Sequence, residues 1–163
     1  MQIPDPSFER VEEFIRDQRV MTLATSDAKG VWSAPVYYVY NAGGLFFFSK
    51  PDSRHIVASG KKRQVAASVY ATGNDWQAIQ GVQMEGSIDT AGVSVASLQS
   101  FDLYRQRFTF FHDLVSEKKE EKLRRPSVIE SVFQVRWYQF IPRVVVFTDN
   151  GIHFGYRQRY VLS

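Results

Sequence analysis

The feature that most constrains this chain is a series of short apolar runs, rich in β-branched and aromatic residues, with turn signals between them. Such runs predict strands, and tight turns between consecutive runs predict antiparallel neighbours. Asn150-Gly151 between two apolar runs is the strongest hairpin signal. The strands are expected at 20–26, 31–40, 45–49, 64–70, 77–89, 132–141, 144–149 and 152–156.

The order of the elements selects a fold class. Strands do not alternate regularly with helices, which argues against a doubly wound parallel sheet. Pro35 lies inside the second run and predicts an edge strand or a bulge, because proline gives no ladder donor. We therefore expect a mainly β domain, an antiparallel sheet closed toward a barrel, with a few helices that fill gaps.

Three helices are expected from apolar spacing and capping residues. They are one after Asp5-Pro6-Ser7 that ends near Arg19, a short one from Asp52 or Ser53 to Gly60, and a longer one from about Ser94. Glu117–Arg125 is expected to be a solvated charged segment that ends at Pro126.

Composition limits the classes of function. A chain of 163 residues is enough for one domain, 1–163. Twenty basic residues against 17 acidic ones fit a small anionic ligand better than nucleic acid, which needs a concentrated basic face. The absence of cysteine excludes thiolate chemistry, and the three scattered histidines give no sign of a metal site. No apolar run is long enough to cross a bilayer, and the N-terminus does not resemble a signal peptide, so a cytoplasmic protein is expected.

The segment that most resembles a ligand-binding site joins the third strand to the short helix. The strand delivers Ser49, and the helix opens with Ser53, Arg54 and His55. A hydroxyl, a guanidinium and the free amides of a helix start can converge on one anion, such as a phosphate monoester. An N-capped surface helix with an exposed arginine explains the same residues, so the pattern alone leaves both interpretations open. No catalytic residue is identified.

The order of these segments is similar to a known family. Val20-Met21-Thr22-Leu23-Ala24-Thr25 is followed by Ala34-Pro35-Val36-Tyr37-Tyr38-Val39, then Leu45-Phe46-Phe47-Phe48-Ser49, Ser53-Arg54-His55 and Val82-Gln83-Met84-Glu85-Gly86. This arrangement resembles the pyridoxamine 5′-phosphate oxidase-like superfamily of FMN-binding split barrels. The ending, 147–155, resembles an uncharacterised bacterial branch of it.

The resemblance implies a homodimer with two FMN molecules, each held by residues of both subunits. By position, Phe48 and Ser49 match the strand end that contacts the flavin. Ser53, Arg54 and His55 match the stretch that holds the FMN phosphate.

Other positions carry over less directly. Gln80 and Gly81 fall where the family has a polar contact to the cofactor on the long strand. Ser33 and Tyr38 stand on the second strand where the oxidase has basic residues, and 156–159 does not match its substrate-binding ending. The resemblance thus implies a cofactor site that includes Ser33, without implying oxidation of pyridoxamine phosphate.

The function expected from the resemblance is an FMN-dependent oxidoreductase that acts on a small molecule, with an electron donor such as NAD(P)H. A flavin does the redox chemistry itself, which explains why no acid–base constellation is evident. The alternatives are a flavin-binding module without turnover, such as a reservoir, sensor or electron relay, or a related barrel that holds deazaflavin F420 or haem. Neither nucleic acid nor a membrane is an expected partner.

Overall fold

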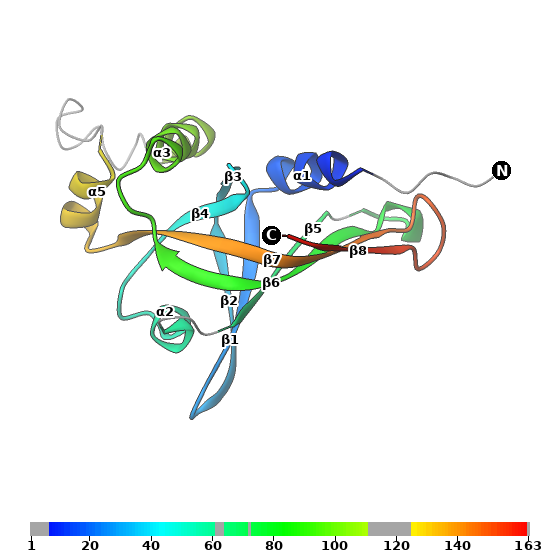
Figure 1. The fold of residues 1–163 in the computed structure, drawn as a ribbon, viewed down its shortest axis with the longest axis horizontal. Coiled ribbons are helices and arrows are strands. Elements are labelled where there is room, and N and C mark those ends of the chain that lie inside the picture. The colour runs from blue at the N-terminus through cyan, green and yellow to red at the C-terminus, as the bar shows by residue number, and fades with distance from the viewer. Residues whose placement is uncertain (1–6, 61–63, 72, 111–124, 163) are drawn as a thin grey trace.

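The computed structural model describes residues 7–60, 64–71, 73–110 and 125–162, and within these ranges it contains one curled antiparallel sheet (Figure 1). The strands are β1 (Val20–Asp27), β2 (Gly30–Tyr37), β3 (Val39–Asn41), β4 (Gly44–Ser49), β5 (Val65–Ala71), β6 (Gln80–Thr90), β7 (Arg136–Asp149) and β8 (Arg157–Val161). Their order in the sheet is β2-β1-β5-β6-β7-β4-β3, with β8 also paired to β7. The predicted fold class, mainly β with an antiparallel split barrel, is confirmed, and the sheet forms a curled half-barrel.

Strand β7 organises the barrel because it pairs along both edges. One edge pairs with β6 from Tyr138 to Asp149, while the other edge pairs first with β4 and then with β8. β2, an edge strand as Pro35 predicts, comes into contact with β4, so the sheet curls around its core. The sheet is therefore split along this edge of β7, between the part that pairs with β4 and the part that pairs with β8.

Three strand predictions are wrong in detail. The run 31–40 is divided into β2 and β3 at Tyr38, whose amide donates to the carbonyl of Arg19 instead of continuing the ladder. The runs 132–141 and 144–149 form one strand, β7, which begins only at Arg136, because 132–133 belong to a helix that Gln134 ends. No strand covers 152–156: Asn150 ties this loop together, and β8 starts only at Arg157.

A bulge explains how β7 continues through a proline. Gly86 of β6 pairs with Pro142 and Glu85 pairs with Val144, so β7 has Arg143 as an additional residue there. Proline is tolerated at such positions because the ladder is already interrupted. Gly86 is required because a Cβ there would lie 2.2 Å from the carbonyl oxygen of Ile141.

The helices lie at the periphery of the sheet (Figure 1). They are α1 (Phe8–Asp17), α2 (Arg54–Ser59), the single 3₁₀ turn η1 (Trp76–Ala78), α3 (Val95–Arg107) and α5 (Pro126–Phe133). The three expected helices are confirmed as α1, α2 and α3, and α5 is an addition. Proline is at the first turn of α5, where its missing amide costs nothing, so Pro126 begins a helix. The predicted charged segment, apart from Arg125, lies outside the described residues.

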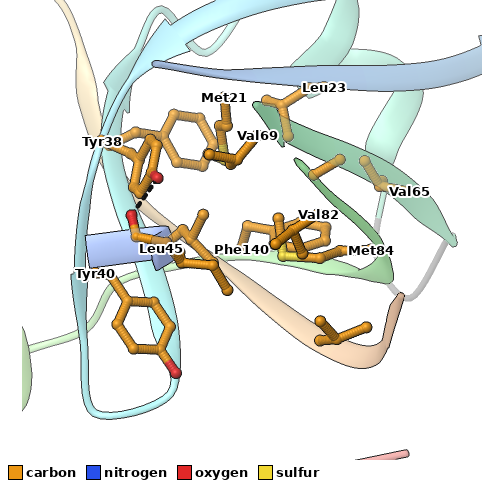
Figure 2. Close-up of a cluster of buried hydrophobic side chains, with 14 of the residues drawn as sticks. Met21, Leu23, Tyr38, Tyr40, Leu45, Val65, Val69, Val82, Met84 and Phe140 are labelled. Atoms are coloured by element: carbon orange, nitrogen blue, oxygen red, sulfur yellow. Dashed lines mark hydrogen bonds between the residues drawn. The ribbon is translucent and has the colours of Figure 1, made fainter. Parts of the chain in front are cut away.

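The main core fills the interior of the curled sheet (Figure 2). Alternating positions of β1, β5 and β6 point inward, as a half-buried antiparallel sheet requires. The cluster includes Met21, Leu23, Leu45, Val65, Val69, Val82, Met84 and Phe140. Tyr38 closes it on the α1 side, where its hydroxyl donates to the carbonyl of Ile15 at 2.5 Å.

A second, aromatic cluster lies on the opposite face of β4, beneath α3 and α5. Phe46 and Trp137 come from the sheet, Phe101 and Tyr104 from α3, and Ile129 from α5. Successive residues of a strand point to opposite faces, so β4 supplies Phe47 to the main core and Phe46 to this cluster. In the described part of the chain, no helix is long and apolar enough to span a membrane.

Candidate functional site

The predicted strand-to-helix junction is present where β4 passes into α2. Ser49 is the last residue of β4, and the amide of Ser53 donates to the carbonyl of Lys50 to close the turn. Ser53 is the N-cap of α2, although its side chain does not cap the helix. Instead the Ser49 hydroxyl donates to the Ser53 hydroxyl at 3.3 Å. The two hydroxyls are therefore adjacent at this corner.

His55 belongs to the same cluster. Its Nε2 lies 2.8 Å from the Ser49 hydroxyl, which is itself buried. Burial lowers the pKa of His55, because the imidazolium would lose solvation. The histidine is thus neutral at pH 7 and takes part in the corner as a hydrogen-bonding group, not as a second cation beside Arg54.

Arg54 is held by the hairpin that joins β1 and β2. Its Nε donates to Asp27 Oδ2 and its Nη2 to Asp27 Oδ1, both at 3.0 Å, and Nη2 also donates to the carbonyl of Gly30 at 3.3 Å. The guanidinium carbon lies 4.7 Å from the centre of the Trp32 ring. Hydrogen bonding to Arg54 lowers the pKa of Asp27, and the same bond raises the pKa of Arg54.

This arrangement decides what the corner can bind. Nε and Nη2 of Arg54 are engaged with the hairpin, which leaves the two N–H groups of Nη1 for a ligand. Two serine hydroxyls and a neutral imidazole add donors and acceptors without further charge. The corner therefore suits an oxyanion, such as the phosphate of a cofactor. Nη1 of Arg54 and the neutral hydroxyl and imidazole groups are the donors available to such an anion.

Phe48 lies next to this corner but points to the other face of β4. Its half-buried ring is 4.4 Å from the ring of Trp137 and meets Tyr104 edge-on at 5.5 Å. A flavin contact of Phe48 stays a prediction.

Gln80 and Gly81 are far from the corner within one chain. Ser49 pairs with Arg136 at the start of β7, whereas Gln80 pairs with Asp149 at its end. Thirteen steps along β7 separate these two partners, roughly 40 Å at about 3.3 Å per residue. Figure 1 shows the two ends of β7 on opposite sides of the molecule. One subunit cannot bring both groups of residues to one flavin.

Ser33 lies on the outer face of the sheet. It pairs with the exposed Ala24 of β1, while its neighbour Trp32 points to the side where Arg54 packs. Beside it, Ala24, Ala66, Ser68, Gln83 and Val146 line an open hollow of about 360 Å³ across β1, β5, β6 and β7. Ser33 therefore faces the outer surface of the sheet and not the Ser49–His55 cluster.

Asp27 and Trp32 are the site residues that the sequence did not reveal. Asp27 predicted only a turn, and it does accept a hydrogen bond from the amide of Lys29 at 2.8 Å. Its partner Arg54 lies 27 positions further along the chain, and only the docking of α2 against the hairpin brings them together. Among the described residues, no group of three or more potential metal ligands is found. His112 lies outside the described residues.

Comparison with known proteins identifies the family. The model of the family described as pyridoxamine 5′-phosphate oxidase matches residues 7–140. A UPF0306 protein of Campylobacter jejuni is 28% identical over 104 residues, which cover 63% of this chain and 73% of the relative.

Solved structures agree on the fold. The chain superposes on a haem-binding protein from Mycobacterium smegmatis with a TM-score of 0.69 at 12% identity, covering 98% of this chain and 60% of that one. It superposes on an FAD-binding protein from Mesorhizobium loti with a TM-score of 0.58 at 15% identity, covering 95% of both chains. At such identities these likenesses show the fold alone. The chain spans less than two thirds of the mycobacterial protein.

Proposed function

The chain belongs to the pyridoxamine 5′-phosphate oxidase family, and from this premise we propose that it binds FMN as a homodimer and acts as a flavin-dependent oxidoreductase on a small molecule. The observation that carries the proposal is the β4–α2 corner. There the side chains of Ser49, Ser53 and His55 are joined by hydrogen bonds, and Arg54, between Ser53 and His55 in the chain, is bound to Asp27 through Nε and Nη2.

The residues of this chain would hold the cofactor in a defined way. Nη1 of Arg54 would donate to the phosphate, with Ser53 and the Ser49–His55 pair beside it. Charge-assisted hydrogen bonds from a guanidinium to phosphate are among the strongest polar contacts in proteins. Bound flavin would supply hydride or electron transfer, and the protein would position it and limit the access of water.

The homodimer is proposed because the remaining family positions lie elsewhere on the chain. Gln80 and Gly81, at the far end of β7 from the corner, can contact the same flavin only if a second subunit contributes them. The outer face of the sheet offers a surface for that subunit. Its small side chains, Thr22, Ala24, Ala66 and Ser68, form a partly apolar, shallow hollow across β1 and β5.

The first test is the visible spectrum of the purified protein, followed by titration with FMN. We expect saturable quenching of FMN fluorescence with one FMN per chain. Arg54→Ala should weaken binding by about 10- to 100-fold, the loss expected for a charged hydrogen bond of roughly 1.5–3 kcal/mol. Arg19→Ala is the matched control, because Arg19 is exposed at the opposite end of β1 from Asp27. A colourless protein without saturable quenching contradicts the proposal.

Turnover requires its own experiment. Rapid reduction of the bound flavin by NADH or NADPH, followed by reoxidation with an acceptor, would support an oxidoreductase. A flavin that is bound but not reduced by either donor would favour the binding module instead. Extraction and mass analysis of the bound molecule would identify deazaflavin F420.

Haem is the second candidate, favoured by the solved haem-binding protein with the same fold. Haem needs an axial ligand, and two histidines lie among the described residues. Nε2 of His55 is engaged with Ser49, whereas His153 is exposed in the β7–β8 loop with its ring against Tyr156. A Soret band that His153→Ala shifts or removes would support haem over flavin.

A further inference from the structure

The ion pair between Asp27 and Arg54 has a geometry that does more than join α2 to the β1–β2 hairpin. The Asp27 carboxylate accepts two hydrogen bonds of 3.0 Å, one from Nε and one from Nη2 of the guanidinium. Gly30 accepts a further bond from Nη2, and the Trp32 ring lies against the guanidinium, 4.7 Å from its carbon. These contacts fix the plane and the rotation of the group, and they leave Nη1 as the edge without a partner among the described residues.

We propose that Asp27 is a positioning residue for the cofactor phosphate: it holds the Arg54 guanidinium so that Nη1 is presented to the anion at the β4–α2 corner. This inference rests on the proposed function and names a residue outside the family positions on which that function is based.

The physical reason is that an arginine side chain loses rotamer freedom when it binds a ligand. A guanidinium that is already held in one orientation loses less of that freedom per hydrogen bond. Arg54 is about one third exposed, so without Asp27 its side chain has solvent to move into. The hairpin thus supplies a rigid support for a group that belongs to a different element.

Charge and positioning make opposite predictions, which makes the idea testable. Asp27 is a negative group beside the proposed phosphate site, so its charge alone disfavours an anion. Removing that charge should strengthen FMN binding if electrostatics dominates. If positioning dominates, removing the carboxylate should weaken FMN binding despite the gain in positive potential.

The experiment is the dissociation constant of FMN for Asp27→Asn. Asparagine keeps an oxygen that can accept the Lys29 amide, so the turn is retained while the paired carboxylate is lost. We expect at least a fivefold weaker affinity for FMN and an unchanged affinity for riboflavin, which lacks the phosphate. Asp52→Asn is the matched control, because it removes the same charge from an exposed position two residues before Arg54. It should leave FMN affinity unchanged or slightly stronger.

A double variant separates positioning from a general structural effect. Asp27→Asn should have no further effect on FMN affinity when Arg54 is already alanine, because there is then no guanidinium to orient. If Asp27→Asn does not fold, Asp27→Glu replaces it, since it keeps the charge but moves the carboxylate by one methylene. It should also weaken FMN binding.

The failures can be told apart. Unchanged or tighter FMN binding by Asp27→Asn, with normal binding by the natural protein, overturns the positioning role and leaves the proposed function intact. Equal losses for FMN and riboflavin overturn it as well, because they show a defect that does not involve the phosphate. Absence of FMN binding by the natural protein overturns both.

Discussion

Tyr38 is fully buried and uses its hydroxyl to bind the carbonyl of Ile15 in α1. Burial raises the pKa of Tyr38, because a phenolate would lose its solvation in the core. The pKa values of Tyr40 and Tyr104 are raised for the same reason. The folded state therefore keeps these three phenols protonated under conditions in which the unfolded chain ionises them.

The first prediction is a loss of stability in alkali. Above about pH 10, the usual tyrosine value, the unfolded chain releases protons that the folded protein retains, so unfolding becomes more favourable as pH rises toward the folded pKa values. Urea unfolding at pH 8 and near pH 11 measures the effect, and Tyr38→Phe should show a smaller fall than the natural protein. An identical fall in that variant would show that Tyr38 does not contribute.

Within the elements, the bulge at Gly86 joins two strands that must stay in register for the barrel to close. Gly86 stands opposite Pro142, and the carbonyl of Ile141 occupies the space that a side chain would need. Because the obstacle is backbone, it cannot move aside as a flexible side chain would.

The second prediction follows from this contact. Gly86→Ala should lower the free energy of unfolding by about 2 kcal/mol, within the usual range for an overpacked core position. Gly92→Ala is the control, since a Cβ there meets nothing within 4 Å. Chemical denaturation compares the two, and equal stabilities would contradict the assigned role of Gly86.

The third prediction concerns the docking of α1. Arg10 donates to Asp149 at 2.8 Å, and the Asp149 side chain is almost completely buried, whereas Arg10 is half exposed. Removing the arginine leaves a buried carboxylate with less compensation, so Arg10→Met should cost about 2 kcal/mol, less than for a pair with both partners buried. Asp149→Asn in the Arg10→Met background should recover part of the lost free energy of unfolding. If it instead lowers that free energy by as much as Asp149→Asn does alone, the two residues are not coupled.

Among the strands and helices, the sequence predicted those features that residues close together in the chain determine. Strand β1, the Asp27–Gly30 turn and helix α2 follow from apolar runs and turn residues close in the chain. The continuity of β7 through Pro142 could not be predicted, because it depends on a bulge against β6, a partner far away in sequence. Helix α5 was missed because three of its eight residues, Val128, Ile129 and Val132, are β-branched and also fit a strand.

The candidate site shows the same division. Ser49, Ser53, Arg54 and His55 were predicted together because a strand end and a helix start keep them adjacent in the chain. The Asp27–Arg54 pair depends on tertiary docking, and so does the separation of Gln80 from the corner. Neither leaves a local signal in the sequence.

For the whole molecule, the proposed function requires two subunits, since the corner and the Gln80 end lie at opposite ends of β7. The fourth prediction is therefore a dimer in solution by light scattering. Ala66→Arg, on the outer face of β5, should shift the protein toward monomer and weaken FMN binding, because a long charged side chain would enter the contact. Val93→Arg, at a position 98% exposed beside α3, should change neither. A natural protein that is a monomer at all concentrations would contradict the shared site.

The central claim is that the β4–α2 corner binds the phosphate end of a flavin. The most direct measurement compares the dissociation constants of FMN and riboflavin for the same protein, because the two ligands share the ring and differ in the phosphate. The account predicts that FMN binds at least tenfold more tightly, and that Arg54→Ala removes most of this difference. Equal affinities for the two ligands, or a preference for FMN that survives the loss of Arg54, would contradict it.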